Sequence, residues 1–309
     1  MELCIEHTPE HTTLSDVTRT AALGEMSSSL ASQIGATELA KLIVRRSNKN
    51  KGDKACKWVQ LATVTPSGLP RARTVVLREV LHPTSSKGLL EHTWGISMIT
   101  DARSTKMRDF SSQPVAELVW LLSRTSEQFR VLGQVTAVGP AGASDQAAGL
   151  DGAESTDVDE REGLQQLRLA AWARMKPGAQ AQMRWPHPGL PKAADEQAAR
   201  SQAGSSGGSS EHPYGSEEGT DVAAPQQAAS SAPPDTFVFL LLRPAVIDHL
   251  ELKTNRRWVY HLPSAKPLAE HTCMGGSAYE DVHLAEGGVP AVLQRCLTES
   301  QYLCTEVNA

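Results

Sequence analysis

Apolar and polar residues alternate along much of the chain, which is the pattern of strands with one buried face. Two such runs cover residues 57–65 and 69–81, and the Pro-Ser-Gly sequence between them is a turn signature. We therefore predict a β-hairpin at this point. Further strands are predicted at 94–100, 115–122, 127–138, 236–252 and 256–262.

Three segments have helical spacing instead. The first, 34–47, has an apolar face and Thr37 as its predicted N-cap. The second begins with Asp101 as N-cap and stops before Pro114, and the third covers 163–175. The apolar residues that define the faces are Leu39, Leu42 and Ile43 in the first helix and Leu164, Leu167 and Trp172 in the third.

This order of elements predicts a mainly β protein of the α+β class. A mostly antiparallel sheet is interrupted by a helix, and the regular alternation of strand and helix that marks a doubly wound fold is missing. A split β-barrel with flanking helices is the closure that we expect.

Composition divides the chain into a domain and outlying segments. Residues 1–33 are a predicted mobile leader, and their acidic residues argue against a transit peptide, which stays the alternative. The domain is predicted at 34–262, with an acidic loop at 141–162 and a disordered insertion at 191–234 that is rich in Ser, Gly, Ala, Gln and Pro. Residues 263–309 are a C-terminal extension whose structure the pattern does not define.

Charge and composition exclude several classes of protein. The net charge of −5 supplies no broad basic field, so neither a nucleic acid nor a membrane surface is an expected partner. The longest clear apolar run, 237–242, is far shorter than the roughly 18 residues of a membrane span. The 5 cysteines have no C-x-x-C spacing, which predicts reduced thiols and no metal site. We expect a cytoplasmic protein, with organelle import by the leader as the alternative.

Candidate anion-binding groups occur in three stretches, one of which is 126–130, where Gln128 can donate and accept hydrogen bonds on a strand. Arg73 and Arg78 bracket an apolar run, and guanidinium forks suit phosphate oxygens. The Ser-Thr-Lys sequence at 104–106 lies at a predicted helix start, where free N–H groups and the helix dipole favour an anion. Strict alternation puts the two arginines on opposite faces of one strand, so either a bulge re-aims one of them or they serve different parts of a site.

Histidine provides no catalytic assignment. His82, His92 and His249 are isolated in the sequence, and a lone histidine is more often a surface or core residue than a catalyst. We therefore name no catalytic residue.

Taken together, the motifs "LATVTPSGLPRARTVVLRE", "SMITDARSTKMRDF", "AELVWLLSRTSEQFRVLGQV" and "PPDTFVFLLLRPAVIDHLEL" resemble the pyridoxamine 5'-phosphate oxidase family of FMN-binding split barrels, and most closely its cyanobacterial and plant branch. The resemblance covers about residues 35–140, 183–189 and 233–262. It implies FMN as the cofactor and a homodimer with two equivalent flavin sites at a two-fold interface.

The family's cofactor contacts carry over to ten positions. Residues 73–76 would border the FMN phosphate and ring, 99 and 100 would line the flavin, and 104–106 would hold the phosphate. These residues are Arg73, Thr74, Val75, Val76, Ile99, Thr100, Ser104, Thr105 and Lys106, with Gln128 reaching the flavin of the dimer. Arg78 stands where the family often has a lysine near the substrate phosphate, and Arg256 or Arg257 with Trp258 is a looser match to a C-terminal Arg and Trp around the flavin.

The implied activity is oxidation of pyridoxamine or pyridoxine 5'-phosphate to pyridoxal 5'-phosphate with O2 as acceptor. This sequence departs from the family pattern at two places. Thr105 replaces an arginine beside the lysine, and residues 162–189 lack the tyrosine of the Tyr, Arg and Ser set that binds substrate phosphate. Arg168, Arg174 and Arg184 are unassigned substitutes within that segment.

These departures keep three alternatives open. One is another split-barrel flavin reductase, including one that uses a deazaflavin. The second is a non-catalytic flavin or haem binder, for which His249 and His261 are the candidate axial ligands. The third is an interaction protein whose insertion recruits partners.

Overall fold

The computed structural model describes residues 32–82, 94–140, 158–185, 232–265 and 301–308. The strands are β1 (Ser32–Gly35), β2 (Trp58–Val64), β3 (Pro70–Val76), β4 (Glu79–Leu81), β5 (Gly95–Asp101), β6 (Val115–Leu122), β7 (Glu127–Val138), β8 (Phe237–Glu251), β9 (Arg256–His261) and β10 (Gln301–Asn308). The helices are α2 (Ala36–Asn48), α3 (Thr105–Ser112), α4 (Val158–Ala173) and α5 (Pro177–Gln182), with 3-10 turns η2 (Lys54–Lys57) and η5 (Pro263–Ala265).

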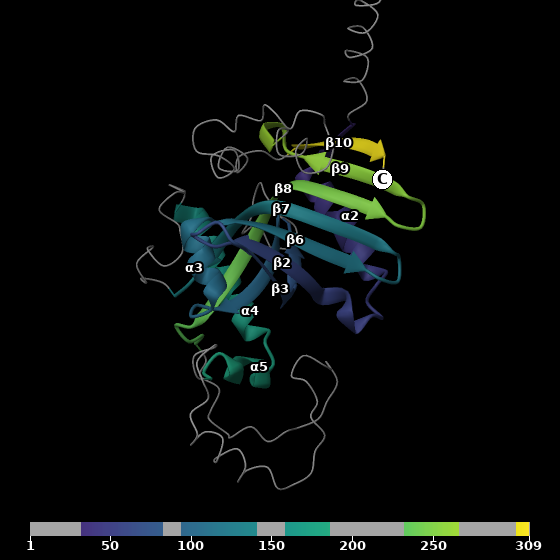
Figure 1. Ribbon diagram of the computed structural model, residues 1–309. Coiled ribbons are helices and arrows are strands. Elements are labelled where there is room, and N and C mark those ends of the chain that lie inside the picture. Colours follow the sequence, from purple (N-terminus) through teal and green to yellow (C-terminus); the bar gives the residue numbers. More distant parts are fainter. Residues whose placement is uncertain (1–31, 83–93, 141–157, 186–231, 266–300, 309) are drawn as a thin grey trace, which may run out of the picture.

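The strands form one antiparallel sheet that does not close. Its order is β1-β10-β9-β8-β7-β6-β2-β3, which Figure 1 shows from β10 at the top of the view down to β3. Among the described strands, β4 pairs with β5 alone, and β5 also pairs with β8. The predicted mainly β, antiparallel fold is confirmed, and the strands at 115–122 and 127–138 have the predicted bounds.

The long strand β8 is the reason that the sheet splits. Its first part pairs with β5 through Leu242, whereas its last part pairs with β9 from Val246 onward. Pro244 lies between the two parts, where its ring nitrogen has no hydrogen to donate. The partner strand β7 shifts register at the same point, between Leu132 and Gly133. The same edge of β8 therefore pairs first with β5 and then, after Pro244, with β9.

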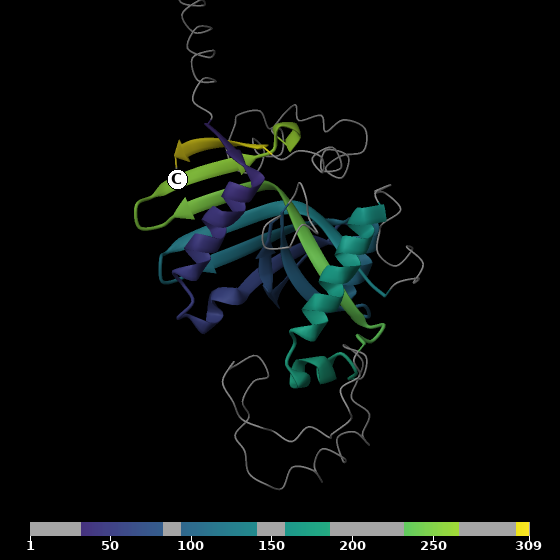
Figure 2. The same ribbon diagram turned by 180° about the vertical axis from the view of Figure 1, so that it is seen from behind.

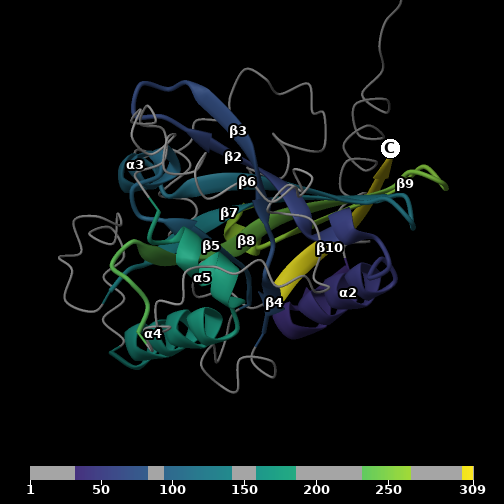
Figure 3. The same cartoon turned by 90° about the horizontal axis from the view of Figure 1, so that it is seen from below.

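Helices cover one side of the sheet and one end of it. Helix α2 contacts β1 and β4, α4 contacts β7 and β8, and Figure 2 shows both on the same side of the sheet. Helix α3 contacts β2, and in Figure 3 it lies apart from α2, beyond the other end of the strands. The predicted apolar faces are confirmed: Leu39, Ile43, Leu164, Leu167 and Trp172 are buried and Leu42 is partly buried.

The predicted hairpin is formed by β2 and β3. The two strands pair along their whole length, from Trp58 opposite Val76 to Val64 opposite Pro70. Gly68 in the connecting turn has a φ of 82°, a conformation that glycine adopts without strain. The turn places the hairpin at the edge of the sheet beside α3.

Two predicted helix caps are wrong. Helix α2 begins two residues earlier than expected, with Gly35 as its N-cap, so Thr37 lies inside its first turn. Helix α3 begins after Ser104 because Asp101 is still the last residue of β5, paired with Phe237. The Asp101 carboxylate instead accepts from the N–H and guanidinium of Arg103. Strand pairing therefore displaced the helix start by three residues.

The outlying segments differ from the prediction where the structure describes them. Residues 158–162, expected in the acidic loop, belong to α4. Strand β10 brings residues 301–308 of the predicted extension into the main sheet, between β1 and β9. Most of the predicted leader, loop and insertion lies outside the described residues. Among the helices that are described, none is both long enough and apolar enough to cross a membrane.

Candidate functional site

Arg73 points to the core face of the β2–β3 hairpin, at its margin. It lies opposite Leu61, which is fully buried, and paired residues of an antiparallel ladder share a face. Its Nη1 donates to the Leu61 carbonyl at 3.2 Å and to the Thr63 hydroxyl at 2.7 Å, and its Nη2 donates to Asp109 Oδ2 at 3.4 Å. A guanidinium has five N–H donors. Among the described residues, these three bonds leave two of the donors without an acceptor.

Lys106 forms a second group of donors at the start of α3. Its ammonium donates to the Thr100 hydroxyl at 2.8 Å and to the Ser104 hydroxyl at 3.1 Å, and these two hydroxyls lie 3.1 Å apart. Burial, and after it the charge of Arg73, lowers the pKa of Lys106, while Asp101 and Asp109 oppose this effect. The two cations are therefore close enough to interact, and an anion between them would relieve their repulsion.

The first turn of α3 adds backbone donors. Ser104 is the N-cap, but its side chain makes no capping bond, because its hydroxyl is engaged with Thr100 and Lys106. Within the described chain, the N–H groups of Thr105 and Lys106 have no acceptor. Free N–H groups at a helix start bind anions. Arg73, Lys106 and this turn thus present the donor set that a phosphate group requires.

The other predicted contacts lie around this cluster. Thr74 is exposed and Val75, Val76 and Ile99 are partly buried, while Thr100 is buried. Alternation places Thr74 and Val76 on the outer face of the hairpin, opposite to Arg73. The predicted contacts of β3 are therefore divided between the two faces of the strand.

Arg78 lies beyond the end of β3, which answers the question raised by strict alternation. The N–H of Leu77 donates to the Lys57 carbonyl, but that of Arg78 donates to the Ser97 carbonyl of β5 at 2.8 Å. The chain changes its pairing partner between the two residues. Arg73 and Arg78 therefore belong to different strand pairs, and no bulge is needed to separate them.

Arg73, Lys106 and the first turn of α3 are together named the phosphate-type cluster, and Gln128 lies away from it. It is half-buried on the outer face of β7, opposite Leu121 of β6 and Leu250 of β8. None of the hydrogen bonds of the described residues connects it with Arg73 or Lys106. One chain therefore brings the phosphate-type cluster together but leaves Gln128 on a separate surface.

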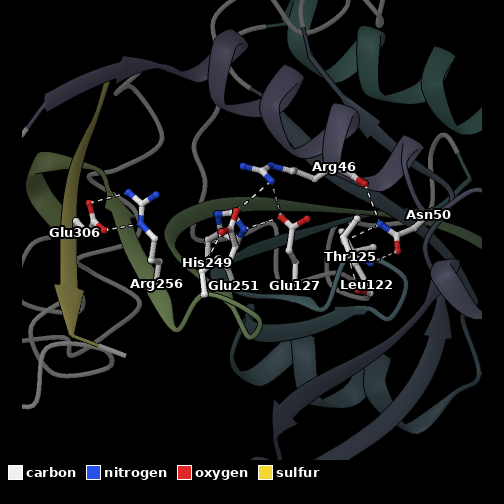
Figure 4. Close-up of polar contacts among 10 residues, drawn as sticks. Arg46, Asn50, Leu122, Thr125, Glu127, His249, Glu251, Arg256 and Glu306 are labelled. Atoms are coloured by element: carbon white, nitrogen blue, oxygen red, sulfur yellow. Dashed lines mark hydrogen bonds and ion pairs between the residues drawn. The ribbon is translucent and has the colours of Figure 1, made fainter.

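A second polar cluster joins α2 to the ends of β7 and β8 (Figure 4). Arg46 bridges Glu127 at 3.4 Å and Glu251 at 3.1 Å, and His249 Nε2 lies 2.9 Å from Glu127 Oε2. The ligand-type atoms of His249 and the two glutamates lie within 4.8 Å of one another, but the guanidinium occupies the space between the carboxylates. The ring of His249 stacks on Phe129 at 4.2 Å. This cluster is an ion-pair network that fixes α2 to the sheet.

This network predicts a pH dependence of stability. Burial lowers the pKa of His249 below its ordinary 6.5, although the hydrogen bond to Glu127 opposes the shift. The unfolded chain then binds a proton more readily than the folded chain, so stability falls as the pH drops below about 6.5. We expect the melting temperature to decrease between pH 7 and pH 5.5, and His249→Gln to reduce that decrease. An equally steep acid slope in the variant would contradict this assignment.

Basic residues from the other predicted regions are already engaged. Arg168 is buried and donates to the Phe237 and Pro234 carbonyls, and Arg174 pairs with Glu79 at 2.6 Å. Near the C-terminus, Arg257 pairs with Asp248 through two hydrogen bonds, whereas Arg256 pairs with Glu306 and lies over the Trp258 ring at 4.7 Å. These contacts hold α4 and β9 in place.

Sequence reasoning missed Thr63 and Asp109. Both are buried polar residues, and the Thr63 hydroxyl donates to Asp109 Oδ2 at 2.7 Å. Asp109 appears in the sequence only as one charged residue of a helix, 36 positions from Arg73. In the sequence, Asp109 lies between Met107 and Phe110, the apolar residues that form the buried face of α3. The sequence therefore offered a sign that this acid is buried, but no sign that its partner is Arg73.

Comparisons with known proteins show which proteins this chain is similar to. Residues 37–139 match the family model described as pyridoxamine 5'-phosphate oxidase, FMN-binding domain. A curated Arabidopsis thaliana protein named pyridoxine/pyridoxamine 5'-phosphate oxidase 2 is 28% identical over 203 residues, which are 65% of this chain and 76% of the relative. The crystal structure of a pyridoxamine 5'-phosphate oxidase-related, FMN-binding protein from Nostoc punctiforme PCC 73102 has a TM-score of 0.51 at 29% identity, covering 72% of this chain and 90% of that chain.

The open antiparallel sheet with flanking helices is a split barrel, the predicted fold. The matched domain is FMN-binding by its description, and the whole fold is similar to that of an FMN-binding protein. These matches confirm the resemblance to the pyridoxamine 5'-phosphate oxidase family that the sequence motifs showed.

Proposed function

We propose that this protein is an FMN-dependent oxidase that converts pyridoxamine or pyridoxine 5'-phosphate to pyridoxal 5'-phosphate, with O2 as the acceptor. The observation that carries the proposal is that Arg73, Lys106 and the first turn of α3 keep N–H donors for which the described part of the chain offers no acceptor. The name of the Arabidopsis relative supports the substrate class. Bound FMN would supply the hydride acceptor, and the chain supplies binding and orientation.

The residues fit the phosphate end of FMN. Arg73 offers its two remaining N–H donors and Lys106 one, beside the hydroxyl of Ser104 and the N–H of Thr105. The exposed Thr105 contributes its backbone at this point, so the arginine that it replaces in the family is not needed for a cationic site. Thr74, Val75, Val76, Ile99 and Thr100 are the proposed neighbours of the ring, and Gln128 is proposed to reach it from a second subunit.

A homodimer is part of this proposal. The outer face of the sheet exposes Trp58 by 41% and Leu121 by 48%. Trp58 pairs with Val76 and Leu121 pairs with Gln128, so the proposed flavin contacts of this face adjoin exposed apolar side chains. Contiguous exposed apolar patches mark interaction surfaces. We propose that Gln128 completes the site of the other subunit across this face.

The interface is testable through its apolar residues. Leu121→Glu should convert a dimer to a monomer, because the buried charge would lack a partner in the interface. Light scattering after gel filtration gives the mass, and FMN content should fall with the loss of the dimer. Leu169→Glu, at an exposed leucine of α4 on the other side of the sheet, is the control and should leave the mass unchanged. A Leu121→Glu protein that remains dimeric would place the interface elsewhere.

The substrate phosphate is assigned to Arg78. This residue is exposed, and its backbone is fixed to Ser97 on the strand that also carries Ile99 and Thr100. Arg168 is tied to carbonyls and Arg174 to Glu79, so these two arginines do not replace the family's substrate set. This observation favours a second candidate function, a flavin reductase of the same fold. The haem alternative gains no support, because His249 and His261 are both packed in the core with hydrogen-bond partners.

One experiment separates these functions. FMN is added to the purified apo-protein while flavin fluorescence is followed, and pyridoxamine 5'-phosphate is then supplied in air. Binding of FMN with formation of pyridoxal 5'-phosphate and peroxide is the expected result. Binding without turnover would favour the reductase, which is then assayed with reduced nicotinamide and deazaflavin donors. A protein that binds no flavin would contradict both.

A further inference from the structure

Asp109 is a buried carboxylate whose placement needs an explanation. It is fully buried on α3, its Oδ2 accepts from Thr63 and Arg73, and its Oδ1 has no partner among the described residues. Burying a charge is costly unless partners compensate for it. A neutral or apolar residue would fill the same position at lower cost, so a structural role alone does not account for an acid here.

The contacts of Asp109 form a closed triangle with Thr63 and Arg73. The Thr63 hydroxyl donates to Asp109 at 2.7 Å and accepts from Arg73 Nη1 at 2.7 Å. Asp109 accepts from the other terminal nitrogen of the same guanidinium at 3.4 Å. The Leu61 carbonyl holds Nη1 as well. Both terminal nitrogens are therefore fixed, and the plane of the guanidinium has little freedom to rotate.

This arrangement also sets the charge of the cluster. Asp109 balances Arg73, so Lys106 remains as the excess positive charge beside the helix start. An acid so close to a phosphate site would repel the ligand if it acted alone. Its contact with Arg73 reverses this effect, because fixing the guanidinium removes the entropy cost of ordering it when the ligand binds.

We propose that Asp109 is a positioning residue that, together with Thr63, holds Arg73 in the orientation that binds the phosphate of the flavin. The inference rests on the proposed function of this site. It adds the prediction that Asp109 affects the affinity only for a flavin that carries a phosphate. Asp109 should affect FMN, which carries the phosphate, and should not affect riboflavin, which lacks it.

The test compares the affinities for FMN and riboflavin in full-length variants. Asp109→Asn keeps the shape of the side chain and an oxygen for the Thr63 hydroxyl, but it removes the charge that holds Arg73. We expect its dissociation constant for FMN to rise about tenfold and that for riboflavin to change less than about twofold, in line with loss of one charged hydrogen bond. Thr63→Val, which removes the hydroxyl, should shift the ratio in the same direction.

Two further variants identify how Asp109 acts. In an Arg73→Ala background, Asp109→Asn should cause no additional loss of FMN affinity, since its effect passes through Arg73. Glu160→Gln is the matched control, because it also removes an acid paired with an arginine, Arg243, but in the contact between α4 and β8. Its ratio of FMN to riboflavin affinity should equal that of the wild type.

The outcomes are distinguishable from failure of the proposed function. If the wild-type protein binds neither flavin, the function is wrong. If it binds FMN and Asp109→Asn binds FMN equally well or more tightly, the positioning role is wrong and repulsion of the phosphate dominates. Equal losses for FMN and riboflavin, with a lower melting temperature, would show a structural role only and would also overturn the inference.

Discussion

Replacing Arg73 with alanine is expected to weaken FMN binding by about 10- to 100-fold, the effect of losing a charged hydrogen bond to phosphate. The side chain offers two N–H donors beyond its three internal bonds, and it lies close enough to Lys106 to lower the pKa of that ammonium. Riboflavin affinity should fall by less than about threefold, because riboflavin has no phosphate for the lost donors to bind.

The same variant should also lose stability. Without Arg73, the fully buried Asp109 keeps only the Thr63 hydroxyl as a partner among the described residues, and an uncompensated buried charge costs about 3 to 5 kcal/mol. The double variant Arg73→Ala, Asp109→Asn removes that charge and should recover most of the melting temperature without recovering FMN affinity. Stability and binding are then measured separately.

Two controls define the interpretation. Arg73→Lys keeps the charge but loses the planar fork, so its FMN affinity should lie between those of wild type and alanine. Arg45→Ala removes an exposed arginine from α2 and should leave the affinity unchanged. Fluorescence titration of each apo-protein gives the dissociation constants. An FMN affinity of Arg73→Ala within about twofold of wild type would remove Arg73 from the site.

The strands were predictable from sequence because alternation is a local signal. Strands β6 and β7 begin and end where the pattern of apolar residues begins and ends. Helix starts were not predictable to the residue, because tertiary contacts decided them. Asp101 has the chemistry of an N-cap, but its pairing with Phe237 of β8 keeps it in a strand. Asp101 and Phe237 are more than 130 positions apart in the sequence, so no local pattern indicates that they pair.

The candidate site was predictable in part for the same reason. Motif resemblance identified Arg73, Ser104 and Lys106, and the structure brings these residues together from β3 and α3. It gave no indication of Asp109 or Thr63, whose relation to Arg73 arises only when α3 packs against β2. Residues that hold a ligand follow motifs, whereas residues that orient them depend on packing between distant elements.

Gly133→Ala is expected to have the largest effect on stability. A Cβ at this position would lie 2.0 Å from the carbonyl oxygen of Arg243 and 3.0 Å from Cα of Pro244. These are backbone atoms of the adjacent strand, so no side-chain rotation can relieve the overlap. The site is the register shift of β7 and β8, the point at which β8 passes from β5 to β9. Separating the two strands there would disturb the pairing on both sides.

We expect the alanine to cost about 3 kcal/mol or more, since it combines overpacking with a distorted bulge. For a domain of this size that loss lowers the melting temperature by roughly 6 to 12 °C. Gly139→Ala is the matched control, because no atom lies within 4 Å of its added Cβ, and it should change the melting temperature little. Calorimetry of both proteins gives the two melting temperatures. A Gly133→Ala protein as stable as Gly139→Ala would contradict the prediction, because it would show that β7 and β8 can separate at the bulge without loss of stability.

Saturating FMN distinguishes a damaged sheet from a damaged site. Gly133 lies on β7, whereas the phosphate-type cluster comes from β2, β3, β5 and α3. A ligand that binds only the folded state raises stability by an amount that depends on its concentration and dissociation constant. The FMN-induced increase in melting temperature should therefore be similar in Gly133→Ala and wild type, although the variant starts from a lower value. A much smaller increase in the variant would show that the bend of β8 at Pro244 also sets the geometry of the flavin site, through the pairing of β8 with β5.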